Sequence, residues 1–399
     1  MKDPLGDDAP PVETRKAVVG ISLMIVAIIA LVIARPSTAV TVAIIVGLIL
    51  TIMLHEFGHY VAAKRSGMKV TEFFLGFGPR LWSFRRGETE YGVKAIPAGG
   101  YVRIIGMTNL EEVDPEDEPR TYRQATTGKR LITVLAGIIV NLVIALVLVF
   151  GILVLHGPEK PSTTIDLVSK GSPAASAGIQ PGDRIVAING TRITNWDQVG
   201  KEIKPNKGKA LTFTVERAGR DVEVTATPKL IEGVPRVGIT STLVGSPMNP
   251  LAAIPRSVTV MRNGVSDTVG ALGKVFSASG LERYGKTVTD SKGGFSDQER
   301  PRSVVGIVAS GNDITGGDWW VLLALLASIN VFVALFNLLP LPPLDGGHAA
   351  VAIYEGIASK VRGRRVRVDY QKLMPVAAAV VVVILVFGLS TIYLDLRSL

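Results

Sequence analysis

The stretch TVAIIVGLILTIMLHEFGHYVAA, residues Thr41 to Ala63, places two histidines and a glutamate inside an apolar run long enough to cross a lipid bilayer. His55 and His59 are four residues apart, which puts both imidazoles on one face of a helix, about 6 Å apart along its axis. With Glu56 they form the HExxH pattern, in which the histidines bind zinc and the glutamate activates water. Ionisable groups at membrane depth are costly without partners, so the cluster predicts a functional site. The alternatives are a chance match to the HExxH pattern and a metal site with a purely structural role.

Composition limits the class of protein. The chain has 399 residues, 47% of them hydrophobic and 19% charged, which excludes a disordered chain and argues against an ordinary soluble domain. It has no cysteine, so a metal site must use histidine, carboxylate or water. The net charge of +9 comes from short basic groups beside apolar runs, as in positive-inside membrane topology. No stacking platform accompanies these charges, so we expect no nucleic-acid partner.

Five apolar runs are long enough to span a bilayer. They are Ala17–Ala34, Val40–Ala63, Leu131–Leu155, Trp319–Leu339 and Met374–Tyr393. The first is interpreted as an uncleaved membrane anchor, because the segment before it is long and carries several acidic residues. A cleaved signal peptide is the alternative. Alternation of the spans and the basic boundaries predict that 64–130 and 360–372 are cytoplasmic and that 156–318 is external.

Between the second and third runs, short alternating stretches punctuated by glycine predict strands, with a hairpin turning at Gly87. This region follows a membrane helix directly, so we expect it to lie against or dip into the cytoplasmic face. The run EEVDPEDEP at 111–119 is expected to be a solvated linker. After the third run, strands, a short helix at Ser172-Pro173 and an amphipathic helix near Trp196–Ile203 predict an α+β domain.

A third metal ligand is expected in FNLLPLPPLDGGHAA, Phe336 to Ala350, where three prolines forbid a continuous helix. Irregular backbone at membrane depth is tolerated only where it lines a cavity, and Asp345 follows this break. Counting from the basic boundaries puts Asp345 and His59 on the same side and at a similar depth. His348 is the rival ligand. Asn337, eight residues before Asp345, is a candidate hydrogen-bond donor to substrate or simply a contact between helices.

Together, HEFGH and the LDG of PLPPLDGGH resemble the two signature motifs of the site-2 proteases, the intramembrane zinc metalloproteases. The stretch from Phe73 to Met107 looks like the membrane-associated β-hairpin region of that family. GSPAASAGIQPGDRIVAING looks like the PDZ domain of RseP-like members, and a single PDZ domain looks closest to the actinobacterial Rip-type branch. The resemblance covers nearly the whole chain from Val40 onward.

The resemblance implies a multi-pass α-helical membrane protein, a site-2 protease core of transmembrane helices with a membrane-associated β-hairpin region and an inserted extracytoplasmic PDZ domain. One zinc ion would be held by His55, His59 and Asp345, with Glu56 as general base. Asn337 would handle substrate, and the hairpin would offer it a strand edge, where we place Gly99, Gly100 and Tyr101. Substrates would be single-span membrane proteins, typically anti-sigma factors already shortened by another protease. The protein would lie in a bacterial inner (cytoplasmic) membrane, with the active site near the cytoplasmic side.

The boundaries expected along the chain are these. They are 1–38 for a cytoplasmic N-terminus and an extra N-terminal transmembrane helix, 39–66 for the catalytic transmembrane helix, 67–110 for the β region, 111–130 for a cytoplasmic linker, 131–157 for a transmembrane helix, 158–230 for the PDZ domain, 231–318 for an extracytoplasmic region, 319–358 for the transmembrane helix with the LDG motif, 359–372 for a basic cytoplasmic segment and 373–394 for the C-terminal transmembrane helix.

Two features depart from the family pattern. The helix expected over Ala17–Ala34 is absent from the four-helix core, and the PDZ stretch lacks a clear glycine-aromatic carboxylate loop, which favours a size filter over a reader of C-termini. Two other functions are weighed. A catalytically weak PDZ adaptor of the same family would be favoured by loss of Glu56 or Asp345, and both are present. A metal transporter or sensor would need ionisable residues along the other spans, which are nearly free of them.

Overall fold

The computed structural model describes residues 29–35, 38–231, 233–289, 292–296 and 299–398. Its contacts divide the chain into two compact units, residues 1–150 with 254–399 and residues 151–253, and each unit is described by itself. Most of the run predicted at Ala17–Ala34 lies outside the described residues. The part of it that the structure describes, 29–34, is helical.

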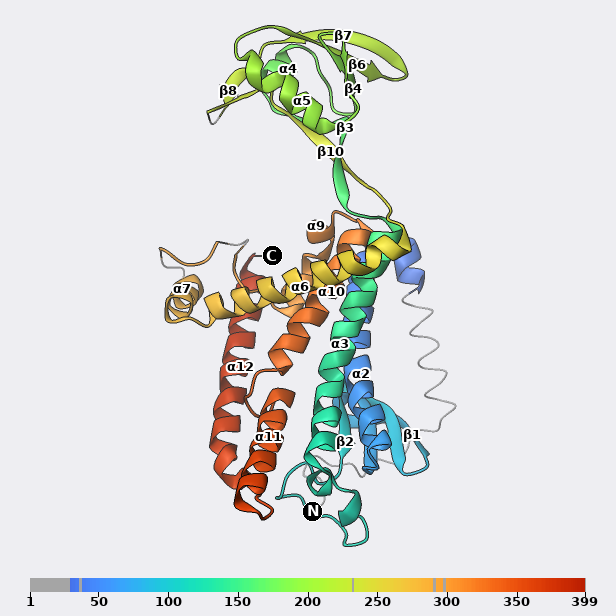
Figure 1. Cartoon of the computed structure of the whole chain (residues 1–399), viewed down its shortest axis with the longest axis vertical. Helices are drawn as coiled ribbons and strands as arrows, with labels where there is room; N and C mark the ends of the chain where they lie inside the picture. Colours follow the sequence, from blue (N-terminus) through green and yellow to red (C-terminus); the bar gives the residue numbers. More distant parts are fainter. Residues whose placement is uncertain (1–28, 36–37, 232, 290–291, 297–298, 399) are drawn as a thin grey trace. The chain divides into compact units, whose positions relative to one another are not determined.

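Among the described residues, four helices are long and apolar enough to cross a membrane (Figure 1). They are α2 (Thr38–Arg65), α3 (Thr127–Leu155), α10 (Trp319–Asn337) and α12 (Tyr370–Ser398). The helices α2, α3 and α12 each contain one of the last four predicted runs, and α10 covers the run Trp319–Leu339 as far as Asn337. In α2, α3 and α12 several leucine, isoleucine and valine side chains are exposed, as suits a lipid surround, and helices satisfy their backbone polar groups internally in lipid.

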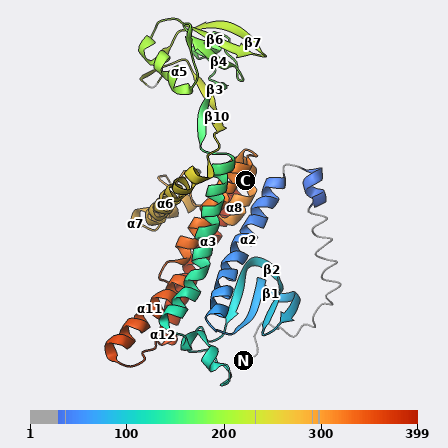
Figure 2. The same ribbon diagram turned by 45° about the vertical axis from the view of Figure 1, so that its right-hand side comes forward.

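In the first unit, α2, α3 and α10 pack together, with β1 and β2 against α2 (Figure 2). Val40 and Ile44 of α2 pack with Leu322 of α10. Ala145 of α3 packs with Ala327 of α10. Gly58 allows α2 to approach α3 closely, because a Cβ there would lie 2.9 Å from the Ala136 carbonyl oxygen. Small residues therefore set the separation of the helices that carry the predicted site.

The proline-rich break predicted within 319–358 divides that segment into two helices. The helix α10 ends at Asn337, and α11 (Asp345–Arg362) begins at Asp345 after the proline-rich break. Gly346 has no room for a side chain, because a Cβ there would lie 2.2 Å from the Leu338 carbonyl oxygen, and Gly347 is equally tight against Pro342. The two glycines thus let the first turn of α11 fold back onto the break, which places Asp345 at a helix N-terminus.

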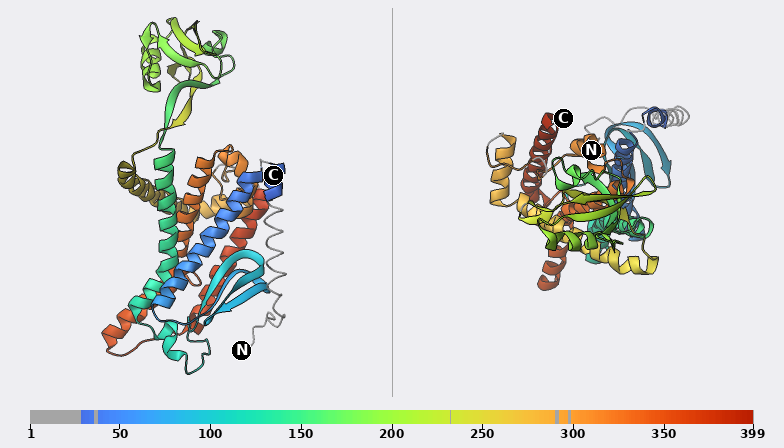
Figure 3. Two further views of the ribbon diagram at one scale, coloured as in Figure 1. Left: turned by 90° about the vertical axis from the view of Figure 1, so that its right-hand side faces the viewer. Right: turned by 90° about the horizontal axis from the view of Figure 1, so that it is seen from above.

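The hairpin predicted after α2 is present as β1 (Val70–Arg86) and β2 (Thr89–Ile104), with Gly87 in the turn at φ 64°. Both strands bend, so their register gives four segments in the spatial order 80–86, 89–94, 70–77 and 100–104. The segment 100–104 is one edge of this sheet. The sheet lies beside α2 (Figure 3). Two 3-10 turns follow, Glu118–Arg120 and Tyr122–Gln124.

The acidic stretch at 111–119 does not behave as a free linker. Asp117 pairs with Lys69, and Glu118 pairs with Arg123 at 2.5 Å. The Glu111 carboxylate accepts a hydrogen bond from the Gly106 amide at 2.7 Å. Its carboxylates therefore fasten the segment to the β region, which a reading of local charge alone does not reveal.

The second unit is built on a sheet in the order β10-β3-β4-β6-β7, with β5 paired to β4. Its strands are β3 (Glu159–Val168), β4 (Arg184–Ile188), β5 (Thr191–Arg192), β6 (Leu211–Arg217), β7 (Arg220–Ala226) and β10 (Ile239–Gly245), with the pair β8 (Lys229–Ile231) and β9 (Val234–Arg236). Its helices are α4 (Pro173–Ser176), α5 (Trp196–Ile203) and the 3-10 turn Lys204–Asn206. The core includes Ile185, Leu211 and Phe213.

The predicted boundary at residue 230 is too early. The strand β10 lies nine residues beyond it and pairs antiparallel with β3, so the compact unit extends to Ala253. Pairing between distant strands is not encoded in local periodicity, and the last clearly alternating stretch of this domain ends before residue 230.

Among the described residues, four more helices follow β10 and precede α10 in the chain. They are α6 (Pro250–Val275), α7 (Ala278–Val288), α8 (Val304–Ala309) and α9 (Gly311–Thr315). Tyr284 of α7 hydrogen-bonds Ser390 of α12 at 2.7 Å. Asp395 accepts from Arg300 at 2.5 Å and from the Ser303 amide at 2.7 Å, so a buried polar cluster fastens these segments to α12.

Candidate metal centre

Three predicted ligands from two distant parts of the chain meet in the first unit. His55 and His59 project from α2, and Asp345 comes from the N-terminus of α11. The Asp345 Oδ2 atom lies 3.1 Å from His55 Nε2 and 3.2 Å from His59 Nε2, and the two Nε2 atoms are 3.2 Å apart. Both histidines are buried and Asp345 is 21% exposed at its side chain, so the cluster is shielded but reachable.

This triangle fits a tetrahedral metal ion. Zinc holds histidine nitrogen and carboxylate oxygen at about 2.0–2.1 Å, which places the atoms of a tetrahedral set about 3.3–3.4 Å apart. The three observed separations are within about 0.3 Å of that value. His59 Nδ1 faces the Thr133 carbonyl oxygen at 2.8 Å, so that nitrogen carries the proton and Nε2 presents a lone pair. Two histidines and a carboxylate leave a fourth position for water.

A glycine of α3 lets that helix approach the cluster. A Cβ on Gly137 would lie 2.5 Å from His59 Nε2 and 2.7 Å from His55 Cε1. Gly137 is one helical turn after Thr133, so the same face of α3 covers both histidines. A larger residue at this position would occupy the space of the ligands.

Glu56 lies on α2 beside the cluster and interacts electrostatically with all three ligands. The backbone amide of Val102, in the edge segment of β2, faces the Glu56 carboxylate. A Cβ on Gly100 would be 3.6 Å from Glu56 Cγ and 3.0 Å from Met53 Sδ. The open edge of the β region therefore runs directly past the glutamate of the HExxH pattern.

The remaining predicted residues lie in β2, at the end of α10 and in the first turn of α11. Gly99 and Tyr101 flank Gly100 in β2; Gly99 has a φ of 147°, and the Tyr101 ring stacks on Phe74 at 5.8 Å. Asn337 is the half-buried last residue of α10. The rival ligand His348 is outside the ligand cluster, and its ring faces Tyr370, with ring centroids 6.3 Å apart.

Two sets of ion pairs join the elements that carry the site to one another. The Arg130 guanidinium of α3 and the Glu355 carboxylate of α11 are both about 95% buried and lie 2.5 Å apart. At the hairpin turn, Glu88 binds Arg120 at 2.8 Å and Lys64, at the end of α2, at 2.5 Å. Hydrogen bonding to Arg120 and Lys64 outweighs partial burial and lowers the pKa of Glu88 to about 2, so this carboxylate stays ionised and joins the hairpin to α2.

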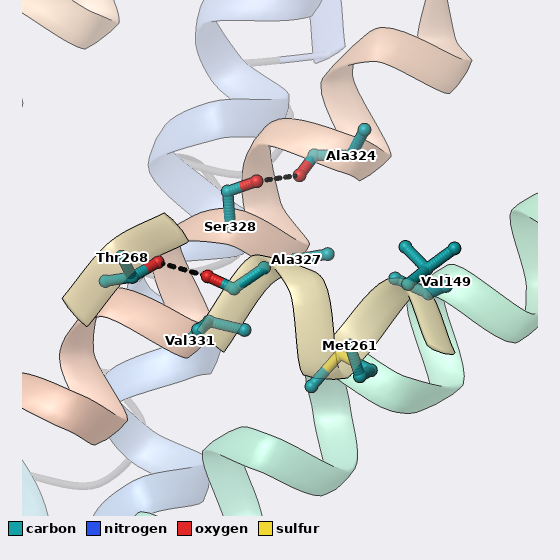
Figure 4. A pocket seen from close by; sticks show the side chains of 9 residues that line it. Val149, Met261, Thr268, Ala324, Ala327, Ser328 and Val331 are labelled. Atoms are coloured by element: carbon teal, nitrogen blue, oxygen red, sulfur yellow. Dashed lines mark hydrogen bonds between the residues drawn. The ribbon is translucent and has the colours of Figure 1, made fainter. Parts of the chain in front are cut away.

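A cavity of about 150 Å³ lies elsewhere in the first unit, between α3, α6 and α10 (Figure 4). Its lining is apolar or small, as Figure 4 shows for Val149, Met261 and Val331, and its polar groups are hydroxyls. Ser328 donates to the Ala324 carbonyl oxygen at 2.9 Å, so that hydroxyl is already satisfied within α10. None of its lining residues is titratable, and the cavity is separate from the metal ligands.

Sequence reasoning missed the residues that surround the ligands. Thr133 and Gly137 lie inside the apolar run Leu131–Leu155, where they count only as tolerated residues. Their spacing of four, shared with the two histidines, is a signal that one face of α3 is matched to one face of α2. Reading it requires knowing that the two helices are neighbours.

The chain is similar to known zinc metalloproteases along most of its length. Peptidase family M50 matches residues 43–385. The zinc metalloprotease Rip1 of Mycobacterium tuberculosis strain Erdman is 35% identical over 389 residues, covering 88% of this chain and 95% of the relative. Rip1 of Mycolicibacterium smegmatis is 35% identical over 391 residues, with the same coverages. Among solved structures, the PDZ domain of an SdrC-like protein from Listeria monocytogenes covers 21% of this chain and 88% of its own, at 21% identity and a TM-score of 0.19.

Membrane-length helices that bring two histidines and a carboxylate together beside a glutamate define a membrane metalloprotease. The chain belongs to Peptidase family M50, the site-2 proteases, as the predicted resemblance indicated. Zinc is accordingly its cofactor.

Proposed function

We propose that the chain is an intramembrane protease that cleaves the transmembrane segment of single-span membrane proteins. The observation that carries this proposal is the His55–His59–Asp345 triangle, with sides of 3.1–3.2 Å, on helices of membrane length and next to Glu56. Anti-sigma factors already shortened by another protease are the substrate class we propose, by analogy with the family resemblance.

His55, His59 and Asp345 would hold the zinc ion. Bound there, zinc supplies a Lewis acid that polarises the scissile carbonyl and lowers the pKa of water to about 7. Glu56 takes a proton from the attacking water and passes it to the leaving amine. Asp345 at the start of α11 is favoured in its charged form by the helix dipole, which suits a ligand that must stay deprotonated.

The edge segment of β2 would present the substrate. A transmembrane helix must unwind before its peptide bonds are accessible, and an extended peptide gains backbone hydrogen bonds from an open strand edge. Residues 100–104 form such an edge, and its Val102 amide points to Glu56. Gly99, Gly100 and Tyr101 would line the approach, and Asn337 would hydrogen-bond the substrate backbone.

We further propose that the second unit is a PDZ domain outside the cytoplasm and that it restricts access by size. Its six-stranded sheet and the short helices α4 and α5 are compatible with that domain type. The basic ends of α2 and α11 favour a cytoplasmic location for that side of the bundle, in the inner membrane of a bacterium.

The test uses Glu56→Gln in the full-length protein in detergent, with a purified single-span membrane protein as substrate. Glutamine keeps the size of the side chain but cannot accept the proton, so we expect one zinc ion per chain and no cleavage. The same variant can then trap bound membrane proteins for identification. Cleavage at the wild-type rate would refute the assignment of Glu56 as general base.

A further inference from the structure

A buried asparagine in α3, one helical turn from the metal ligands, has no hydrogen-bond partner among the described residues. Asn141 is 0% exposed, and both its amide oxygen and its amide nitrogen are shielded from solvent. Buried polar groups are nearly always paired, and an unpaired amide in an apolar helix requires an explanation.

Two further unpaired atoms occur nearby in the bundle. They are His55 Nδ1 and Asn330 Oδ1, both buried and without a partner in the described part of the chain. In the proposed site His55 Nε2 gives its lone pair to the metal, so the ring proton lies on Nδ1 and needs an acceptor. His59 has such an acceptor in the Thr133 carbonyl oxygen. The two ligands therefore differ only in that His55 lacks its second partner.

The register of α3 points Asn141 at this missing partner. Thr133, Gly137 and Asn141 are spaced by four and share one face of the helix. The first contacts His59, and a Cβ on the second would be 2.9 Å from His55 Nδ1. Helical side chains tilt toward the N-terminus, so the Asn141 amide is directed back to the Gly137 turn.

The helix α10 approaches the same level from the other side. The Asn330 Nδ2 atom donates to Thr51 Oγ1 at 3.0 Å, and Thr51 is one turn before His55 on α2. The next α10 residue, Val331, packs in a cluster with Ala145, which is one turn after Asn141 on α3. Asn141 thus lies on the level where all three helices converge.

We propose that Asn141 is the positioning residue for the metal ligand His55. Its Oδ1 accepts the Nδ1 proton of His55, directly or through one water molecule, and its Nδ2 donates to Asn330 Oδ1. Each unpaired atom is then satisfied once, in a hydrogen-bonded chain that ends at Thr51. Such a partner fixes the orientation of the imidazole and raises its basicity, as the Thr133 carbonyl does for His59. This role rests on the proposed zinc site.

The test measures zinc affinity of the full-length protein in detergent by competition with a chromogenic chelator. We expect Asn141→Leu to weaken zinc binding about 10–100-fold. Asn141→Asp keeps an acceptor for His55, so it should stay within about threefold of the wild type, as a carboxylate partner suits a zinc-bound histidine. Asn330→Leu breaks the far end of the chain but leaves Asn141 Oδ1 as the acceptor for His55, so its loss of zinc affinity should be clearly smaller than that of Asn141→Leu.

Wild-type affinity in Asn141→Leu would overturn the proposal. Equal losses in Asn141→Leu and Asn330→Leu would overturn it too, because the amide would then serve helix packing alone. His55→Ala separates this result from failure of the metal site itself: zinc retained in His55→Ala refutes the site, whereas zinc lost only in His55→Ala refutes the role of Asn141. If leucine prevents folding, Asn141→Ala replaces it with the same expectation, and the absorption spectrum of the cobalt-loaded protein reports the ligand geometry independently.

Discussion

Replacing Gly137 by alanine adds one methyl group where α3 meets the two histidines. The added Cβ would lie 2.5 Å from His59 Nε2 and 2.7 Å from His55 Cε1. Ordinary contact between such atoms needs about 3.5 Å, so either the rings or the helix must move by about 1 Å. Metal–ligand distances tolerate only about ±0.2 Å. Although the substitution adds only one carbon atom, it therefore displaces the ligand nitrogens by more than metal binding tolerates.

We expect Gly137→Ala to weaken zinc binding at least about 100-fold, which corresponds to about 2.8 kcal/mol. The fold should survive, because alanine favours a helix by up to about 1 kcal/mol over glycine. The measurement is zinc content per chain after purification, together with chelator competition. Gly151→Ala is the matched control, since it lies in the same helix and its Cβ would meet nothing within 4 Å. Wild-type zinc affinity in Gly137→Ala would refute the placement of α3 against the ligands.

Three further predictions address the elements around the site. Glu355→Gln leaves the buried Arg130 without its partner and should destabilise the protein by about 3–5 kcal/mol in thermal unfolding, and a double variant with apolar residues at both positions should recover most of this. Burial raises the pKa of Asp183, but hydrogen bonds from Arg217 and the Gln180 amide outweigh it, so the net pKa is below the ordinary 3.8. The resulting stabilisation is present above pH 3.8 and is lost as the pH falls below it, so the protection of the second unit against hydrogen exchange, relative to the intrinsic exchange rate, should fall there. Asp183→Asn should abolish that pH dependence. Gly100→Val crowds Met53 and the edge of β2, and it should lower the cleavage rate at least about tenfold with zinc content unchanged; equal losses of zinc and rate would contradict this.

The membrane helices were predictable because each is a long apolar run, rich in leucine, isoleucine, valine and alanine. The hairpin turn at Gly87 and the helix over Trp196–Ile203 were also predictable, since local turn chemistry and amphipathic spacing encode them. The strand β10 was not, because its partner β3 lies about 70 residues earlier in the chain. The bends of β1 and β2, which make residues 100–104 an edge, also depend on pairing that no local pattern specifies.

The candidate ligands could be identified because histidine and aspartate are rare in apolar runs, so their positions carry information. The residues behind them could not. Thr133 acts through a backbone carbonyl oxygen, which any residue could provide, and Gly137 acts through the absence of a side chain. Asn141 stands out in its run only when the neighbouring helix is known. Ligands are a matter of side-chain chemistry, whereas their supports are a matter of which helix faces which.

The most direct test of the zinc site is the zinc content of the purified full-length chain, compared between the wild type and Asp345→Asn. Asparagine keeps the size of the ligand but removes its charge, and the observed triangle has Asp345 Oδ2 at 3.1–3.2 Å from both histidine Nε2 atoms. We predict one zinc ion per wild-type chain and a marked loss in the variant. Unchanged zinc in Asp345→Asn would contradict the assignment and would point to His348 as the third ligand.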